Sequence, residues 1–404
     1  MPPRRTAVKP RPAVEGGKPV RREPLAFFRP VVGEAEETAV RKVLRSGWIT
    51  TGPTAHAFEA ALAKRLGAKH LALVSSATIG LSLALEALGV GPGDEVITSP
   101  ITFVATANVI MHRGARVRFV DVDPETLTLD PAAARRAVNA KTRAILPVHL
   151  AGHPADLDPL LRLARTHRLA VIEDAAHAFG ARYKGQPIGL WGDATVFSFH
   201  AVKNLTSAEG GAVTVKDPEV LARIRRLANH GLDADAWQRF RERRWGYVMP
   251  EPGYKANLSD LHAAVGLAQL ARFNAFQKRR RAISAAYHRA FVDNPALNVP
   301  TQARWTEHAW HVYILRLRPE RVKIHRDRFL EALAAEGILG NVHYFPVHLQ
   351  PYYRKTYGYA PGDLPVAEAA SRATVTLPLY PAMTDTDVRD VVAAVDKLTA
   401  YYGR

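Results

Sequence analysis

Lys203 is the residue whose surroundings most clearly suggest chemistry. It follows the apolar run Thr195–Ser198 on a short turn, and the chain then passes through the pair Gly210-Gly211 into another apolar run. Burial on such a turn would lower the pKa of the amine, which favours the neutral state that a Schiff-base nucleophile needs. An isolated lysine would reach solvent from a loop. Here the double glycine and the hydroxyl at the end of the run favour a backbone that folds closely around a ligand.

A carboxylate, Asp174, comes directly after the apolar run Ala170–Glu173. At the end of a strand it could hold the nitrogen of a pyridinium ring and so make that ring an electron sink. It could equally cap the N-terminus of a following helix, which is the commonest structural task of aspartate at such a position. Taken alone, the residue does not decide between these two interpretations.

Two further features follow predicted strands. Ser75-Ser76-Ala77-Thr78 opens a helix, where free amides and hydroxyls can bind a phosphate, although such residues also form ordinary N-caps. Phe103 follows the next strand and could stack on a flat ring or belong to the core. The order along the chain is a phosphate-type helix start, an aromatic, an aspartate and then a lysine. That order is typical of the large domain of fold-type I pyridoxal-phosphate enzymes.

These residues need a sheet to bring them together. Short apolar runs alternate with helical stretches such as Thr78–Leu88 and Val104–Arg113. Largely apolar strands belong to a sheet covered on both faces, and their alternation with helices indicates parallel pairing. Ligands of such sheets gather at the carboxyl ends of the strands. The predicted strands are Leu71–Val74, Glu95–Thr98, Val117–Val120, Ala144–Val148, Ala170–Glu173, Thr195–Ser198 and Ala212–Val215.

The pattern predicts an α/β protein with a large domain over residues 25–275 and a smaller α+β domain over 276–404. Helical segments are expected at Ser259–Phe273 and Phe276–Phe291, and an apolar strand at His311–Leu317. Residues 1–24 carry seven basic and two acidic side chains with many prolines. We expect them to form a disordered, solvated tail rather than an arm for nucleic acid or an anionic membrane.

The chain has a formal net charge of +17, which raises the alternative of a nucleic-acid-binding protein. The charge lies neither on a recognisable reading helix nor among interleaved aromatics, so no nucleic-acid partner is expected. The clusters Arg239–Arg244 and Lys278–Arg281 look like a surface loop and a helix face. The absence of cysteine excludes disulfides, thiolate metal sites and a cysteine nucleophile, and no metal is expected. With no apolar run of membrane-spanning length and no export signal, we expect a cytoplasmic enzyme without membrane insertion.

Several segments together are similar to one family, and they occur in one order from about Leu25 to the C-terminus. They are Ser46–Pro53, Ser75–Thr78, Gly93–Ile97, Pro147–His149, Glu173–His177, Phe197–Asn204 with Ala208–Gly211, and Gly253–Leu258. In these segments the chain resembles the DegT/DnrJ/EryC1/StrS family of sugar aminotransferases. The resemblance implies the fold-type I architecture and pyridoxal 5'-phosphate as cofactor.

The resemblance also implies roles for single residues. Lys203 should bind the cofactor covalently and later move a proton, and Asp174 should bind the pyridine nitrogen. His177 should lie near the ring hydroxyl, and Phe103 should stack on the ring. The cofactor phosphate should be held by Ser76, Ala77, Thr78, Ser198 and, from the partner subunit of a homodimer with a shared active site, Asn257. Alternatively, this asparagine only caps or precedes a helix of its own subunit. Substrate contacts are expected at Thr51, His343 and His348.

The implied reaction transfers an amino group from L-glutamate, which leaves as 2-oxoglutarate, to a keto sugar carried by a nucleotide. The stretches Trp48–Pro53, His200–Asn204 and Gly253–Asn257 look most like the enzyme that makes UDP-4-amino-4-deoxy-L-arabinose for lipid A of lipopolysaccharide. In contrast, Asn341–Pro351 resembles enzymes that act on UDP-4-keto-6-deoxy-hexosamines. A non-catalytic regulatory protein of the same fold is the other alternative, and the presence of both aspartate and lysine argues against it.

Overall fold

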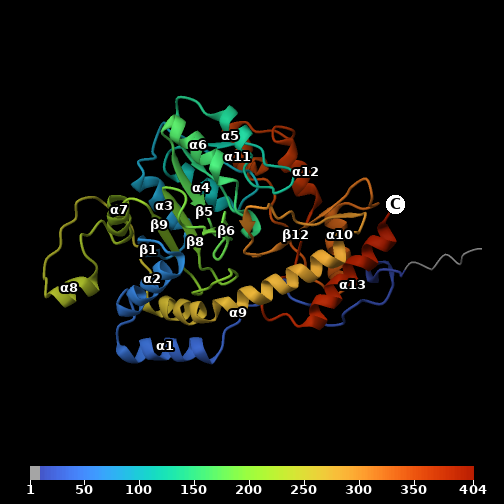
Figure 1. The fold of residues 1–404 in the computed structure, drawn as a ribbon, viewed down its shortest axis with the longest axis horizontal. Coiled ribbons are helices and arrows are strands. Elements are labelled where there is room, and N and C mark those ends of the chain that lie inside the picture. Colours follow the sequence, from blue (N-terminus) through green and yellow to red (C-terminus); the bar gives the residue numbers. More distant parts are fainter. Residues whose placement is uncertain (1–9) are drawn as a thin grey trace, which may run out of the picture.

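A seven-stranded sheet forms the centre of the molecule (Figure 1). The structure is a computed structural model that describes residues 10–404. The strand order is β1-β9-β8-β5-β4-β2-β3. The strands are β1 (His70–Val74), β2 (Glu95–Thr98), β3 (Arg116–Phe119), β4 (Thr142–Leu146), β5 (Ala170–Asp174), β8 (Ala194–Ser198) and β9 (Gly211–Val215).

The sheet is mainly parallel, which confirms the expected fold class. Strand β9 runs antiparallel to both of its neighbours, β1 and β8. The other neighbours pair in parallel. A parallel crossover needs a dozen or more residues, usually with a helix, whereas β8 and β9 are joined by a turn without one. The connection that carries Lys203 has no helix to return the chain to the other end of the sheet, so β9 runs back antiparallel to β8.

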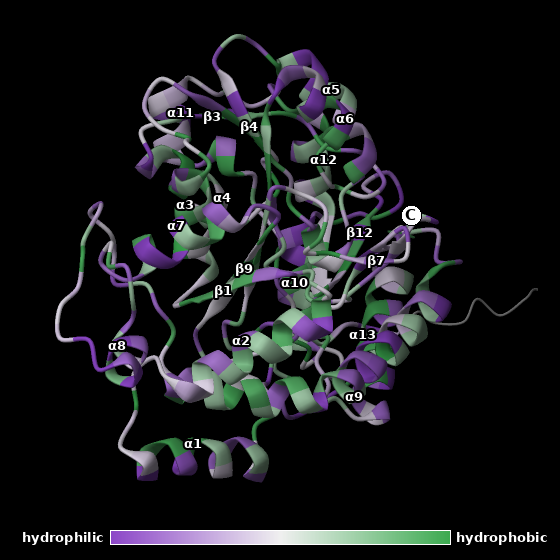
Figure 2. Cartoon of the chain, turned by 60° about the vertical axis from the view of Figure 1, so that its left-hand side comes forward, coloured by the Kyte–Doolittle hydropathy of each residue, from purple (hydrophilic) through white to green (hydrophobic). Residues whose placement is uncertain are grey.

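Both faces of the sheet are buried, and successive residues of a strand enter different hydrophobic clusters. In β4, Ala144 and Leu146 pack with three helices, α3 (Ala77–Ala87), α4 (Val104–His112) and α7 (Pro218–Ala228), whereas Ile145 packs with α5 (Pro131–Ala137) and α6 (Leu157–His167). In β8, Val196 belongs to the first cluster and Phe197 to one formed with α2 (Pro53–Leu66) and α9 (Asp260–Phe291). Figure 2 colours much of the central strands green, the colour of hydrophobic residues. The apolar character of each strand therefore reflects two covered faces.

The helices begin at residues suited to capping. Ser76 accepts a hydrogen bond from the amide of Ile79 at the start of α3, and Ser259 does the same for His262 at the start of α9. The helices are α1 (Glu34–Ser46), α2 (Pro53–Leu66), α3 (Ala77–Ala87), α4 (Val104–His112), α5 (Pro131–Ala137), α6 (Leu157–His167), α7 (Pro218–Ala228), α8 (Ala236–Glu242), α9 (Asp260–Phe291), α10 (Arg326–Ala335), α11 (Pro351–Tyr357), α12 (Pro365–Ala373) and α13 (Asp385–Tyr402).

One long helix, α9, connects the two parts of the chain. It runs without a break through the region where two helical segments were expected. Its first half contacts α1 and α2, and it reaches α13 at its other end (Figure 1). The domain boundary expected between residues 275 and 276 falls inside this helix. The boundary stays a prediction, because α9 contributes to the packing of both parts.

The C-terminal part has a hydrophobic core of its own around a three-stranded sheet. Its strands, in the order β10-β12-β13, are β10 (Leu297–Asn298), β12 (Tyr313–Leu317) and β13 (Thr374–Leu377). Helices α10 and α13 and the end of α9 supply much of this core, and Leu25 joins it from the N-terminal segment. A second small sheet is built from β6 (Arg182–Tyr183), β7 (Gln186–Pro187) and β11 (Thr306–Glu307).

The expectation of a disordered tail is wrong for residues 10–24. A short 3-10 helix, η1 (Ala13–Glu15), begins a segment that packs on the C-terminal core. The amides of Ala13 and Val20 donate hydrogen bonds of 2.7 and 2.9 Å to the fully buried carboxylate of Glu336. Composition predicted disorder because this segment has few large apolar side chains, but its backbone is held by a distant carboxylate. Residues 1–9 lie outside the described part.

Among the described residues, no helix combines the length and the apolar character needed to cross a lipid bilayer.

Candidate active site

A pocket of about 390 Å³ lies at the carboxyl ends of β5 and β8. The C-terminal part closes one side of it with residues that include His311, Asn341 and Tyr344. Nine of the twelve predicted site residues line this pocket: Ser76, Ala77, Thr78, Phe103, Asp174, His177, Ser198, Lys203 and His343. The structure thus brings together side chains from segments far apart in the sequence.

The turn between β8 and β9 presents Lys203 to the pocket. Its base is closed by a hydrogen bond of 2.8 Å from the amide of Phe199 to the carbonyl of Gly210. Gly210 has φ +156°, and a Cβ there would lie 2.3 Å from the hydroxyl oxygen of Ser207. Removal of the Lys203 amine from water lowers its pKa to about 8, and the nearby charge of Asp174 partly opposes this shift. The turn therefore holds an amine that loses its proton at a lower pH than an exposed lysine does.

Asp174 ends β5 and is almost completely buried. One carboxylate oxygen accepts a hydrogen bond of 2.7 Å from the hydroxyl of Thr106, and the other accepts one of 3.1 Å from the amide of Ala176. Thr106 in turn lies 2.7 Å from the hydroxyl of Thr102. These contacts fix the carboxylate in the pocket, where its remaining lone pairs can accept a hydrogen bond from a protonated ring nitrogen.

The start of α3 forms the anion-binding end of the pocket. Its first residues, Ala77 and Thr78, have amides that find no acceptor within their own helix. The positive end of the helix dipole adds to the attraction for a phosphate. Gly211 of β9 lies so close that a Cβ there would be 2.9 Å from the amide nitrogen of Ala77. The glycine is thus required by the close approach of the lysine-bearing turn to this helix.

His177 has a defined hydrogen-bonding pattern. Its Nδ1 accepts a hydrogen bond of 3.3 Å from the amide of Ala151, so the neutral ring carries its proton on Nε2. That Nε2 lies 3.1 Å from the hydroxyl oxygen of Tyr344. Burial holds the pKa of His177 well below its usual range, and the nearby Lys203 acts in the same direction. The pocket therefore contains a neutral histidine whose Nε2–H can donate a hydrogen bond.

Aromatic rings form the open wall of the pocket. Phe103 precedes α4 and is 59% exposed, which excludes the alternative of a core aromatic. Its ring centroid lies 6.3 Å from that of Tyr344. Burial lowers the pKa of His343 to about 4, so this side chain is neutral at physiological pH. A flat ligand would find apolar ring surface here and charged groups deeper in the pocket.

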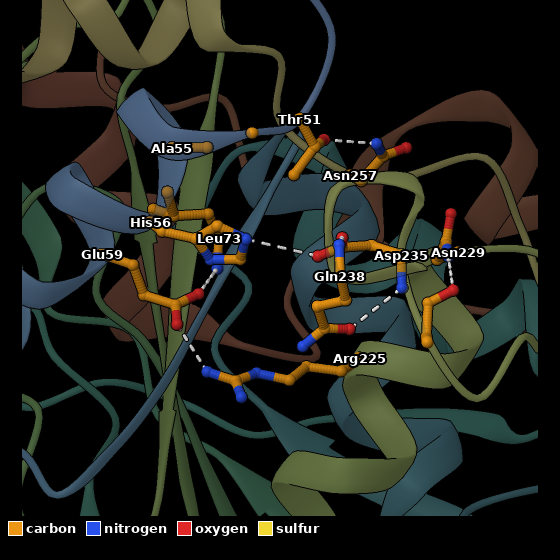
Figure 3. Close-up of polar contacts among 12 residues, drawn as sticks. Thr51, Ala55, His56, Glu59, Leu73, Arg225, Asn229, Asp235, Gln238 and Asn257 are labelled. Atoms are coloured by element: carbon orange, nitrogen blue, oxygen red, sulfur yellow. Dashed lines mark hydrogen bonds and ion pairs between the residues drawn. The ribbon is translucent and has the colours of Figure 1, made fainter. Parts of the chain in front are cut away.

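Three predicted site residues lie elsewhere. Asn257 donates a hydrogen bond to the hydroxyl of Thr51, and both line a separate cavity of about 450 Å³ (Figure 3). His348 is fully buried, and its Nε2 lies 3.2 Å from a carboxylate oxygen of Glu368. This placement gives no support to a substrate contact by His348.

Three further residues of the site were not predicted from the sequence. Thr106 holds Asp174, Tyr344 contacts His177, and the His311 ring lies 4.4 Å from the His177 ring. Thr106 lies one helical turn after Thr102 and could have been found from that spacing once the start of α4 was known. The other two come from the C-terminal part. Tyr344 directly follows the predicted site residue His343, which could have drawn attention to it, whereas no local pattern indicates that His311 reaches the pocket.

The pocket fits pyridoxal 5'-phosphate at both ends. The amides of α3 suit its phosphate, the Asp174 carboxylate suits its ring nitrogen, and the Lys203 amine lies in the same cavity. Together with a mainly parallel sheet, these features define a fold-type I pyridoxal-phosphate enzyme. A model of the DegT/DnrJ/EryC1/StrS aminotransferase family matches residues 30–396. The chain belongs to this family.

Relatives cover almost the whole chain. The spore coat polysaccharide biosynthesis protein SpsC of Bacillus subtilis is 45% identical over 373 residues, which is 92% of this chain and 96% of that protein. The PMP (pyridoxamine phosphate) form of the candidate sugar aminotransferase Spr1654 from Streptococcus pneumoniae has a TM-score of 0.88 and 35% identity, covering 93% of this chain and 99% of that one. Helicobacter pylori PseC, an aminotransferase involved in pseudoaminic acid biosynthesis, has a TM-score of 0.87 and 29% identity, covering 94% and 100%.

The protein is therefore a pyridoxal-phosphate-dependent sugar aminotransferase. This confirms the predicted enzyme class and cofactor. The two alternatives, a nucleic-acid-binding protein and a non-catalytic protein of the same fold, receive no support from the family or the pocket.

Proposed function

We propose that the enzyme transfers an amino group from L-glutamate to C4 of a UDP-linked 4-keto sugar. The proposed product is UDP-4-amino-4-deoxy-L-arabinose, used in lipid A modification. The observation that carries the aminotransferase assignment is the single pocket that unites Lys203, Asp174 and the start of α3. The choice of sugar is supported by the similarity of Trp48–Pro53 and Gly253–Asn257 to the enzyme that makes this product.

The residues of the pocket have distinct tasks in this reaction. Bound pyridoxal 5'-phosphate supplies an electron sink for the carbanion that forms when a proton leaves the substrate carbon. Lys203, with a pKa lowered to about 8, can accept that proton and return it to a neighbouring position. The Asp174 carboxylate keeps a proton on the ring nitrogen, and Thr106 keeps the carboxylate in place. His177 offers its Nε2 proton toward Tyr344 and adds no charge.

A second candidate substrate is a UDP-4-keto-6-deoxy-hexosamine. The segment Asn341–Pro351, which contributes His343 and Tyr344 to the pocket, is the stretch that resembles enzymes for such sugars. The likeness to PseC, whose name places it in pseudoaminic acid biosynthesis, favours the same candidate. Substrate comparison therefore has to include both sugars.

The test is an amination assay with L-glutamate and each of the two UDP-linked 4-keto sugars, followed by identification of the amino sugar product. We expect the pentose to give the higher kcat/KM. Lys203→Ala is the control for background reaction, because it removes the proton-transferring amine. Preference for the hexosamine would select the second candidate, and failure to aminate either sugar at C4 would refute the proposal.

We further propose a homodimer in which Asn257 binds the cofactor phosphate of the partner subunit. In this subunit Asn257 and Thr51 line a cavity that shares no residue with the Lys203 pocket. This separation supports a role in another subunit's site. The alternative remains that Asn257 only precedes the N-cap Ser259 of α9 in its own chain.

A subunit-mixing experiment separates these alternatives. Lys203→Ala subunits, which lack the amine, are combined with Asn257→Ala subunits, which should bind the cofactor weakly. If Asn257 acts on the partner, a mixed dimer contains one site with both residues intact, so activity should exceed that of either parent. No gain after demonstrated subunit exchange would place Asn257 outside the partner's site.

A further inference from the structure

A second hollow, of about 820 Å³, lies between α2, α9 and the hairpin formed by β6 and β7. It shares no lining residue with the pocket around Lys203. Its floor includes the buried apolar residues Leu66, Ala181 and Phe273. Cationic side chains from three elements surround this floor: Lys64, Arg65, Arg182, Lys278 and Arg281.

The positive charge of this hollow is largely uncompensated. Glu307 is the single carboxylate among the lining residues, and it lies 3.9 Å from Arg182 and 3.6 Å from Arg281. Within residues 10–404, neither lysine of the hollow has a carboxylate at ion-pair distance. Five cationic side chains against one carboxylate leave a surplus of four positive charges. Such a concentration in a concave site attracts anions and raises their local concentration.

One guanidinium of the hollow is held in position. Arg65 donates a hydrogen bond of 2.8 Å to the side-chain oxygen of Asn274, and its guanidinium lies 4.5 Å from the centre of the Phe273 ring. Burial lowers the pKa of Arg65, and the neighbouring charge of Arg182 lowers it further. The fold thus keeps two guanidinium groups close enough to repel each other. An anion between them would relieve this repulsion, and a planar guanidinium suits two oxygens of a phosphate.

We infer that this hollow binds a small molecule carrying two or more linked phosphate groups. Its volume lies within the range of small-molecule sites, and its surplus charge matches that of a di- or triphosphate. A nucleic acid fits less well, because single-stranded binding uses exposed aromatic rings for base stacking. Phe273, the aromatic among the lining residues, is only 1% exposed. The site lies outside the catalytic pocket, so the inference does not depend on the proposed sugar.

The test is calorimetric titration of the full-length, cofactor-loaded enzyme with inorganic tripolyphosphate at physiological salt. Loading the cofactor fills the phosphate site at the start of α3, so that site does not compete. The variant Lys64→Ala/Lys278→Ala removes two exposed cations from the hollow. Because a hydrogen bond to a charged group contributes about 1.5–3 kcal/mol, we expect the Kd to rise at least about tenfold.

A matched control removes the same charge from another surface. Arg162 and Arg165 are exposed on α6 and lie outside the hollow. We expect Arg162→Ala/Arg165→Ala to keep the Kd within about twofold, since exposed charges at a distance are screened by salt. An opposite effect is expected from Glu307→Gln, which removes the carboxylate of the hollow and should tighten binding.

Several results would overturn the inference. The first is the absence of saturable tripolyphosphate binding to the wild-type enzyme. Equal weakening by the α6 control would show that only overall charge matters, and no weakening by Lys64→Ala/Lys278→Ala would place the anion elsewhere. If an oligonucleotide with the same number of phosphates bound more tightly than tripolyphosphate, the hollow would be a nucleic-acid site and not a small-molecule site. The melting temperatures of all variants show whether each one is folded.

Discussion

Deletion of residues 1–24 should destabilise the C-terminal part of the protein. The deletion removes the two amides, of Ala13 and Val20, that bind the buried carboxylate of Glu336. Lys397 remains as the partner of this carboxylate at 2.8 Å. The salt bridges of Arg21 with Asp387 and Asp390 are also lost, but these side chains are partly exposed, and such pairs contribute less than about 1 kcal/mol each. The amides are therefore the largest of these polar contributions, and the apolar contacts of Val14 and Val20 with the core add to them.

The size of the effect follows from the charge of the acceptor. A hydrogen bond to a charged group contributes about 1.5–3 kcal/mol, so two of them give about 3–6 kcal/mol. The lower end applies, because truncation also lets water reach the Glu336 carboxylate. For a chain of 404 residues, a loss of about 3 kcal/mol lowers the Tm by roughly 3–4 °C, because the entropy of unfolding is about 2.1 cal/mol/K per residue. The measurement is thermal unfolding of the purified full-length and truncated chains with cofactor in excess.

Two controls make this prediction specific. Deletion of residues 1–9 alone removes none of these contacts and should leave the Tm unchanged. In a Glu336→Gln background, the 1–24 deletion should cost less, because the amides then lose a neutral acceptor instead of a charged one. A truncated protein that melts at the same temperature as the full-length chain would refute the reasoning. It would show that the packed segment does not contribute to stability.

Three further predictions concern single side chains. Borohydride treatment should trap the cofactor covalently on the wild-type enzyme but not on Lys203→Ala, as measured by protein mass; a trapped adduct in the variant would reject Lys203. Asp174→Asn should lower kcat at least about hundredfold, because a neutral amide cannot keep the ring nitrogen protonated; Thr106→Val, which removes only a hydrogen bond to that carboxylate, should cost less. Burial lowers the pKa of His153 from its ordinary 6.5 to about 4. The unfolded chain therefore binds more protons than the folded one between these values, and the free energy of unfolding should fall as pH drops through this window, by about 3 kcal/mol for this group. The measurement is the free energy of unfolding from denaturant titrations at pH 7 and pH 5. His153→Gln should make the two values differ less than in the wild type; the same difference in both proteins would contradict the lowered pKa of His153.

The strands could be predicted from the sequence because both sheet faces are buried. Apolar, β-branched runs stand out when neither face is polar, and the predicted bounds differ from the observed ones by at most two residues, as for Ala144–Val148 against Thr142–Leu146. Helix α9 was expected as two segments, although Asn274 and Ala275 between them do not interrupt a helix. The residues after the strands could be predicted as well, because parallel strands deliver them to one edge.

Contacts between distant segments could not be predicted in the same way. His311 enters the pocket from the C-terminal part, and its local sequence carries no sign of that destination. Tyr344 enters it next to the predicted site residue His343, but its contact with His177 could not be read from that neighbour. The disorder of residues 10–24 was predicted from their composition. Composition contains no information on backbone contacts, and two backbone amides of this segment bind Glu336. Lys278–Arg281 was expected to be a helix face and does lie on α9, but Arg280 of this run is buried and donates to the carbonyls of His311 and Leu379 at 3.0 and 2.9 Å. In each case the deciding partner lies far along the chain.

The antiparallel strand β9 explains how the lysine reaches the phosphate-binding helix. Its first residue, Gly211, pairs with Val74 at the end of β1 and with Ser198 at the end of β8. Helix α3 starts after only two residues, Ser75 and Ser76, beyond β1, and the turn that carries Lys203 starts directly after β8. Because β9 runs antiparallel to both neighbours, it begins between these two ends, and the missing side chain of Gly211 lets the backbone approach Ala77. A crossover to a parallel strand would instead carry the chain away to the opposite edge of the sheet. The double glycine and the helix-free turn therefore serve the same end: they bring the amine of Lys203 and the phosphate-binding amides of α3 into one pocket.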